Sequence, residues 1–383
     1  MIIYARSPYL VEIYGALQTT SKIDLFLWNY PNSVPASATY TLSKNVASNA
    51  QRSTVYNIAP YLREYIENIN GSIPTAPALE SNTSFVNFKY ISYSNNTNRT
   101  LAFKTRVLAD SGTYEADDCL GIFMNDYIIG GAVDGYSNFT GGINQTNPLN
   151  NFYLLADNSK EIQYTLGKIP YVNVLINKDT NDRLDIEYKD IRGNFVVTTT
   201  VAPITLSAKN YLYKIPLTTS STNYNDGTIA TLKYYVNGVL TYSSIFNVNP
   251  ICESKYIPVV CSFINRFGGR QFLTFFKAQS NQLTVSSTMY NLLPSNFNYN
   301  VYQGQSKAFN FNARQTVTLN TGFVPQNYSD LIQDLMLSEV VLLDNKPVTL
   351  KTTQTDLKTT LRDKNINYTI DFEYAYNLLN NVI

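Results

Sequence analysis

The most constraining feature of the sequence is a pair of strongly apolar runs around two adjacent glycines. Residues 259–264 and 271–276 are rich in β-branched and aromatic side chains, and Gly268 and Gly269 lie between them. Such a pattern predicts a β-hairpin, because glycine reaches the positive φ angles that tight turns need. Both runs are apolar at successive positions, so both faces are expected to be covered. The segment 251–277 is therefore predicted to be a central hairpin with domains or subunits packed against each side.

The composition is typical of an all-β protein. The chain has 383 residues with 31 tyrosines and 13% aromatic residues, and this residue usage favours strands. Its length is enough for about two or three domains. No apolar run reaches the roughly 18 residues of a membrane span. The N-terminus lacks the basic and apolar regions of a signal peptide, so a protein that stays inside the cell that makes it is expected.

Turn and linker signals divide the chain into four segments. Residues 1–78 are expected to form an N-terminal β-sandwich of the immunoglobulin or fibronectin type, because short strands alternate there with proline- and asparagine-containing turns. Residues 79–250 are expected to be a middle β domain, 251–327 the central hairpin region and 328–383 a C-terminal α/β block. The predicted fold class is mainly β with several domains.

The middle segment contains the clearest turn signal of the chain. Asn237-Gly238 lies between two strand-like runs and predicts a type I′ hairpin. The runs 171–176, 185–188 and 194–197 are expected to form a β-meander, because polar turns separate them.

The C-terminal segment combines one helix with strands. Ser329 is expected to cap a helix that runs through Leu337. The run Ile366–Tyr376 alternates between an aromatic-rich face and a polar face, which predicts a half-exposed antiparallel strand. Its apolar face or its free edge is expected to meet a neighbouring chain, because a block of about 55 residues buries only about 60% of its unfolded-chain surface by itself.

The chain has no histidine, and this absence excludes several kinds of chemistry. Ser-His-Asp and Cys-His nucleophile pairs and His-ligated metal centres all need that side chain. The three cysteines, Cys119, Cys252 and Cys261, have no metal-type spacing and are interpreted as buried thiols, with a Cys252–Cys261 bridge as the alternative. The net charge of +1 gives no electrostatic reason to expect binding to nucleic acid or to an anionic membrane.

Several polar clusters are candidate sites, and none is expected to be catalytic, cofactor-binding or metal-binding. Asp117 and Asp118 are interpreted as surface carboxylates, since adjacent acids on a strand point to opposite faces. The segment Asn177–Arg183 differs from a calcium loop at the positions of a ligand and the turn glycine. Glycoside hydrolysis needs two carboxylates and no histidine, but no motif selects such a pair. Exposed tyrosines are interpreted mainly as strand packing, with stacking on sugars as the alternative.

Three sets of residues resemble virion structural proteins of tailed phages that infect Bacteroidetes, including crAss-like phages. They are Ser7–Asn29 with Tyr56–Ile66, Cys252–Ala278, and Leu335–Thr352 with Asn365–Val382. The resemblance implies a bacteriophage tail protein in the virion, assembled in the host cytoplasm into a ring, hub or tail barrel around the tail axis. It implies a homo-oligomer of about six or twelve copies, with other tail or portal-proximal proteins as partners.

The sequence therefore predicts a non-enzymatic structural subunit with no cofactor, no sequence-specific nucleic-acid binding and no membrane insertion. A receptor- or glycan-binding tail module is the alternative, for which the loop 130–151 is the candidate binding segment. A polysaccharide depolymerase is a third hypothesis. Binding to glycans, or turnover of a polysaccharide, would distinguish these alternatives from a purely structural role.

Overall fold

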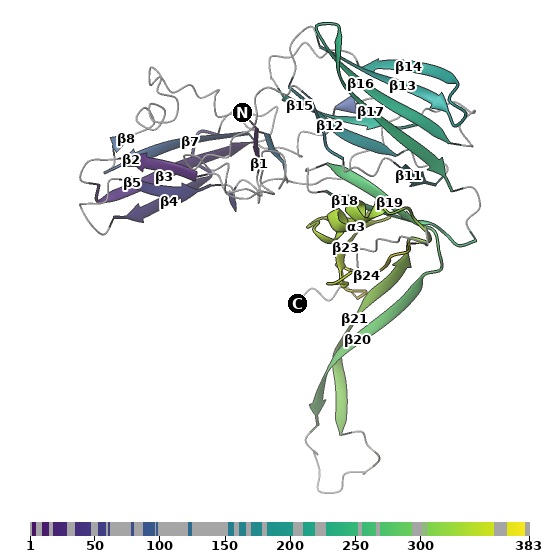
Figure 1. Cartoon of the computed structure of the whole chain (residues 1–383). Helices are drawn as coiled ribbons and strands as arrows, with labels where there is room; N and C mark the ends of the chain where they lie inside the picture. The colour runs from purple at the N-terminus through teal and green to yellow at the C-terminus, as the bar shows by residue number, and fades with distance from the viewer. Residues whose placement is uncertain are drawn as a thin grey trace. The chain divides into compact units, whose positions relative to one another are not determined.

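The computed structural model describes the chain in segments. The described residues are 2–4, 10–14, 18–28, 35–46, 53–58, 60–61, 78–79, 87–95, 97–98, 122–124, 152–156, 161–165, 170–177, 182–201, 210–218, 227–251, 255–265, 269–292, 302, 305–355 and 366–379. Strands predominate among them and most pair antiparallel, so the prediction of a mainly β protein is confirmed (Figure 1). No helix in these segments is long and apolar enough to cross a membrane.

The chain divides into two compact units. The first contains Met1–Ile162, Gly167–Asn249 and Ile264–Gln271, and the second contains Gln163–Leu166, Pro250–Phe263 and Phe272–Ile383. The four-segment division expected from the sequence stays a prediction, as does the immunoglobulin-like type of the N-terminal module.

The N-terminal strands of the first unit form two small sheets around one core. One sheet has the order β4-β3-β7-β8 and the other pairs β2 with β5. Their bounds are β2 Leu10–Tyr14, β3 Thr20–Trp28, β4 Tyr40–Asn45, β5 Ser53–Asn57, β7 Asn87–Ser94 and β8 Thr97–Asn98. Ile23, Leu25 and Leu27 alternate along β3 and are buried, as the sequence pattern predicts. A short parallel pair, β1 (Ile2–Tyr4) with β9 (Ile122–Met124), completes this part.

Two further sheets of the first unit face each other across a buried core. Their orders are β10-β12-β15-β6 and β11-β17-β16-β13-β14. The strands of the first are β6 Ala78–Leu79, β10 Phe152–Leu154, β12 Tyr171–Asn177 and β15 Asn210–Pro216. Those of the second are β11 Glu161–Tyr164, β13 Arg183–Asp190, β14 Phe195–Val201, β16 Thr228–Val236 and β17 Val239–Pro250.

Two aromatic contacts link these facing sheets. The Tyr188 hydroxyl of β13 donates to the carbonyl oxygen of Pro216 at 2.7 Å, and Phe152 stacks on Tyr234 with ring centroids 4.9 Å apart. The predicted meander is wrong, because β12 lies in one sheet and β13 and β14 lie in the other. Alternation identifies a strand but not its partner, and the partner of β12 is the distant strand β15.

The predicted type I′ turn between β16 and β17 is confirmed. Asn237 and Gly238 have φ angles of 50° and 81°, both in the left-handed region that this turn needs.

The second unit is organised around a seven-stranded sheet with the order β19-β18-β22-β23-β24-β21-β20. Its strands are β18 Val259–Ile264, β19 Arg270–Phe275, β20 Ser280–Asn291, β21 Ser306–Asn320, β22 Val341–Leu343, β23 Lys346–Leu350 and β24 Thr369–Tyr374. Helix α3 (Tyr328–Met336) packs its apolar side chains on one face of this sheet. The residues 328–383 therefore do not form a sheet of their own, because β22–β24 share one with β18–β21.

The predicted central hairpin exists as β18 and β19, and it is buried on both faces. Cys261, Phe263, Leu273 and Phe275 lie in the core, and their neighbours Ser262 and Thr274 are buried as well. The sequence predicts a positive φ at Gly268 or Gly269 in the turn. Gly269 does not have one. Gly268 lies outside the described residues.

Helix α3 begins two residues earlier than predicted. Its N-cap is Asn327, and Ser329 is inside the helix with its N–H bonded to the carbonyl oxygen of Gln326 at 3.0 Å. Tyr328 and Leu331 are both buried, so packing of the apolar face draws Tyr328 into the first turn.

The expected free edge of the last strand is wrong. β24 pairs with β21 on one side and β23 on the other. Its aromatic face is covered within the same chain, since Tyr368, Ile370 and Phe372 are buried with the side chains of α3. Alternation along the sequence correctly predicts which face of this strand is buried. The expected position at an edge of the sheet is wrong, because β24 lies between two other strands.

Candidate interaction surface

The β20–β21 hairpin is the largest exposed feature among the described residues of the second unit. β20 has 12 residues, all of them exposed, and β21 has 15 residues. β24 pairs only with 316–320 of β21, so the rest of the hairpin is a two-stranded ribbon that extends away from the sheet (Figure 1). An isolated two-stranded ribbon is marginally stable in water. A feature of this length therefore implies additional contacts.

One face of this hairpin continues the buried face of the sheet. Asn281 is opposite Val317, and Val317 is opposite Phe372, so the three share a face. Val317 and Phe372 are 2% and 0% exposed and belong to the core that α3 covers. Side chains two residues apart lie on the same face of a strand. The face under α3 therefore continues outward along the odd-numbered residues of β20.

The continuation of this face is apolar and exposed. Leu283, Val285 and Met289 are 56%, 58% and 58% exposed. Ala313 and Ala308 lie opposite Val285 and Met289, and Gln315 lies opposite Leu283. We call Leu283, Val285 and Met289 the apolar stripe. Burying such a stripe is favourable by roughly 25 cal/mol per Å² of apolar surface, so a partner that covers it would gain stability.

The opposite face of the hairpin is polar near the sheet. It carries Gln282, Thr284 and Ser286 on β20, opposite Thr316, Arg314 and Asn312 on β21. Tyr290 and Phe309 pack edge to face near the far end, with ring centroids 5.4 Å apart. The hairpin is therefore amphipathic along most of its length.

The outer edge of β20 carries backbone groups that no described strand uses. The Leu292 N–H donates to the carbonyl oxygen of Gln305 at 2.6 Å, so the even-numbered residues of β20 point their backbone groups toward β21. The odd-numbered residues, including Val285 and Met289, then point their N–H and C=O groups to the outer edge. β20 is the last strand in the order of the sheet, and nothing in the described part of the chain pairs with that edge.

This edge lacks the features that usually prevent strand pairing. Native edge strands carry charged residues or proline, or they are short. β20 has the sequence SNQLTVSSTMYN, which contains neither charge nor proline over 12 residues. Its one irregularity is the register shift beside Ser287, where Asn310 of β21 adopts a positive φ of 53°. That bulge lies on the inner strand and leaves the outer edge of β20 regular.

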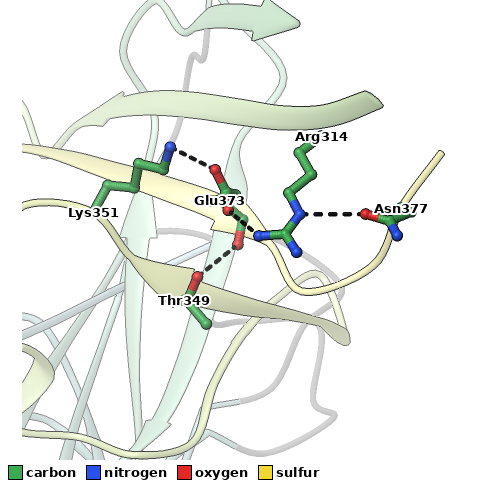
Figure 2. Close-up of polar contacts among 5 residues, drawn as sticks. All are labelled: Arg314, Thr349, Lys351, Glu373 and Asn377. Carbon is green, nitrogen blue, oxygen red and sulfur yellow. Dashed lines mark hydrogen bonds and ion pairs between the residues drawn. The ribbon is translucent and has the colours of Figure 1, made fainter. Parts of the chain in front are cut away.

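Polar contacts at Glu373 hold the base of the hairpin in the sheet (Figure 2). The Arg314 Nη1 of β21 lies 3.2 Å from Glu373 Oε1, and the Lys351 Nζ is paired with Glu373 Oε2. Arg314 also donates from Nε to Asn377 Oδ1 at 3.3 Å. Hydrogen bonds from Lys351 and then from Arg314 hold the pKa of Glu373 below its ordinary value. One carboxylate thereby connects β21, β24 and the segment after β23.

The structure places some of the residues considered from the sequence. Asp182 accepts a hydrogen bond from Tyr234 at 2.7 Å and is buried, and Arg183 pairs with Asp185 at 2.9 Å. Residues 178–181 of the same segment lie outside the described residues. Cys261 is a free, buried thiol whose pKa is raised by burial, as the main interpretation predicts. Asp117, Asp118, Cys119, Cys252 and the loop 130–151 lie outside the described residues.

No cluster of three or more Cys, Asp or Glu side chains suited to a metal ion occurs in the described segments. The sequence contains a signal for this exposed hairpin that the expectations above do not include. Apolar residues at 283, 285 and 289, on one face of a run without charge, predict an edge strand with one mainly apolar face. This signal is weak beside the neighbouring runs 259–264 and 271–276, which are more strongly apolar.

Comparison with family models and with curated proteins finds no match to this sequence.

Proposed function

We propose that the protein is a non-enzymatic structural subunit that assembles with copies of itself into a ring, hub or barrel of a bacteriophage tail. The observation that carries the proposal is the β20–β21 hairpin, whose apolar stripe continues the core face of the sheet and stays exposed. A monomer that functions alone gains nothing from a long exposed ribbon of this kind. A subunit that buries the ribbon against a neighbour gains the free energy of burying the apolar stripe.

The link to phage tails rests on the sequence resemblance. The resembling residues Cys252–Ala278 and Leu335–Thr352 contain all of β18, β19, β22 and β23 and the last two residues of α3. They thus supply much of the core of the second unit, from which the hairpin extends. The resembling part and the proposed assembly element belong to one unit.

Purified full-length protein tests the proposal. We expect a closed oligomer of uniform mass by light scattering, visible as a ring by negative-stain electron microscopy. In phage particles that carry this chain, antibody labelling should be confined to the tail. A protein that stays monomeric at high concentration and in the virion would contradict the proposal. Saturable hydrolysis of a polysaccharide, lost on changing one Asp or Glu, would contradict the non-enzymatic role.

A further inference from the structure

We propose that the β20 edge of one copy pairs with the far part of β21 of the next copy, so that the hairpins close into an antiparallel β-barrel. This inference rests on the proposed function, because it names the contact that closes the ring. It assigns the occupant of the open edge to a second copy of this chain.

The first argument is that one hairpin carries both halves of the contact. Among the described residues, nothing pairs with the outer edge of β20, and residues 306–310 of β21 extend beyond the contacts with β24 and with the C-terminal residues 375–379. That segment reaches β21 at Ala313, where the Leu378 N–H donates to the Ala313 carbonyl oxygen at 2.9 Å. Gln305 points its carbonyl toward β20, so Ser306 and Ala308 point their backbone groups away from it.

The second argument concerns direction. β20 and β21 run antiparallel within the hairpin. Hairpins related by rotation about a common axis all point the same way, so β20 of one copy meets β21 of the next in an antiparallel orientation. Repeating this contact around the axis closes a barrel, and closure removes every open edge.

The third argument is that charge does not oppose the contact. β20 contains no charged residue, and residues 306–310 contain only Lys307. Like charges opposite each other would destabilise strand pairing, and none occur here. Each contact is short, but a closed ring gives every copy two of them.

Proline substitutions at residues that point outward test the edge directly. Val285→Pro and Ala308→Pro each remove one outward N–H and leave the hydrogen bonds between β20 and β21 intact. The controls are Gln282→Ala and Thr284→Ala on the polar face of β20, which keep every N–H and lie outside the apolar stripe. We expect each proline variant to raise the concentration for half-assembly at least about tenfold, because the variant loses a ladder hydrogen bond and a regular edge. The controls should stay within about threefold, and all four should match the wild-type circular dichroism spectrum.

Mixing the two proline variants identifies the partner strand. Val285→Pro keeps an unaltered β21 edge, and Ala308→Pro keeps an unaltered β20 edge. An equimolar mixture should therefore give a heterodimer in which these two edges pair. If Ala308→Pro assembles normally and Val285→Pro does not, β20 pairs with itself across a two-fold axis and the barrel is overturned.

Amide hydrogen exchange at single-residue resolution gives a second readout that needs no variant. In the assembly, the amides of Leu283, Val285 and Met289 should exchange at least about tenfold more slowly than in the diluted monomer. The amides of Thr284 and Ser286, which face β21, should change little. An assembled ring with fast exchange at the odd-numbered residues would overturn this inference and leave the ring itself standing. A wild-type protein that never assembles would overturn both proposals.

Discussion

Gly269 lies in direct backbone contact with Leu155. A β-carbon built on Gly269 would be 2.2 Å from the Leu155 carbonyl oxygen and 2.7 Å from its Cβ. The same carbonyl oxygen accepts a hydrogen bond from Asn265 Nδ2 at 2.9 Å, and the Gly269 N–H donates to Asn265 Oδ1 at 2.9 Å. Glycine is therefore required here for close approach and not for a positive φ.

Replacing Gly269 with alanine should destabilise the fold by about 3 kcal/mol or more, because an added methyl group meets backbone atoms that cannot yield. Gly193→Ala is the matched control. Gly193 has a φ of 87° and no atom within 4 Å of an added β-carbon, so its substitution should cost only about 1 kcal/mol of backbone strain. Urea unfolding of both variants measures the difference. Equal losses would mean that Leu155 moves aside without cost.

The sequence predicts the local chemistry of this fold better than its long-range pairing. Asn237-Gly238 is a correct turn because the φ requirement is local, and the buried face of 366–372 is correct because alternation reports it. The position of β24 between β21 and β23 was missed, since neither neighbour follows from its own residues. The interaction surface was missed for the same reason. Only the pairing of β21 with β24 reveals that the face of Val317 continues into the apolar stripe.

Tyr188→Phe should lower the free energy of unfolding by about 1–2 kcal/mol, because the buried carbonyl oxygen of Pro216 loses the hydrogen bond from the Tyr188 hydroxyl. Tyr242→Phe is the control, since Tyr242 is exposed and its ring contact with Phe152 is kept. The free energies follow from denaturation of each variant. A Tyr188→Phe protein as stable as Tyr242→Phe would show that this bond between the sheets contributes nothing.

Glu373 should make the second unit less stable in acid. The pKa of Glu373 is lowered from its ordinary value of 4.5 because Lys351 and Arg314 bond to the carboxylate. The stabilisation is therefore fully present above the unfolded-state pKa and is lost as the pH falls through the lower folded-state pKa. We expect wild type to have a higher urea midpoint than Glu373→Gln at neutral pH and the two midpoints to converge in acid. Lys351→Met should remove part of the same pH dependence, and 1 M salt should weaken it. Midpoints that differ equally at all pH values would contradict an ionic origin.

Phe372 should act on stability and not on assembly. It is fully buried and packs edge to face on Phe275, with ring centroids 5.8 Å apart. Phe372→Leu should cost about 1–2 kcal/mol as a cavity forms, while the size of the oligomer stays that of wild type. Phe372→Asp would unfold the unit, because a charge in this core has no partner, so it does not test an interface. An oligomer of altered size in folded Phe372→Leu would contradict this assignment.

The last prediction separates the two faces of the exposed hairpin. Leu283 and Gln282 are neighbours on β20, but Leu283 belongs to the apolar stripe and Gln282 points to the polar face opposite Thr316. Leu283→Lys places a charge where the neighbouring copy is expected to bury apolar surface, so it should prevent assembly. Gln282→Lys adds the same charge on the same strand and should assemble like wild type. Both residues are exposed, so each substitution should change the free energy of unfolding of the monomer by less than about 0.5 kcal/mol. Light scattering at matched concentrations measures the assembly. If Leu283→Lys assembles as well as Gln282→Lys does, the apolar stripe is not buried between copies, and the exposed ribbon needs another explanation.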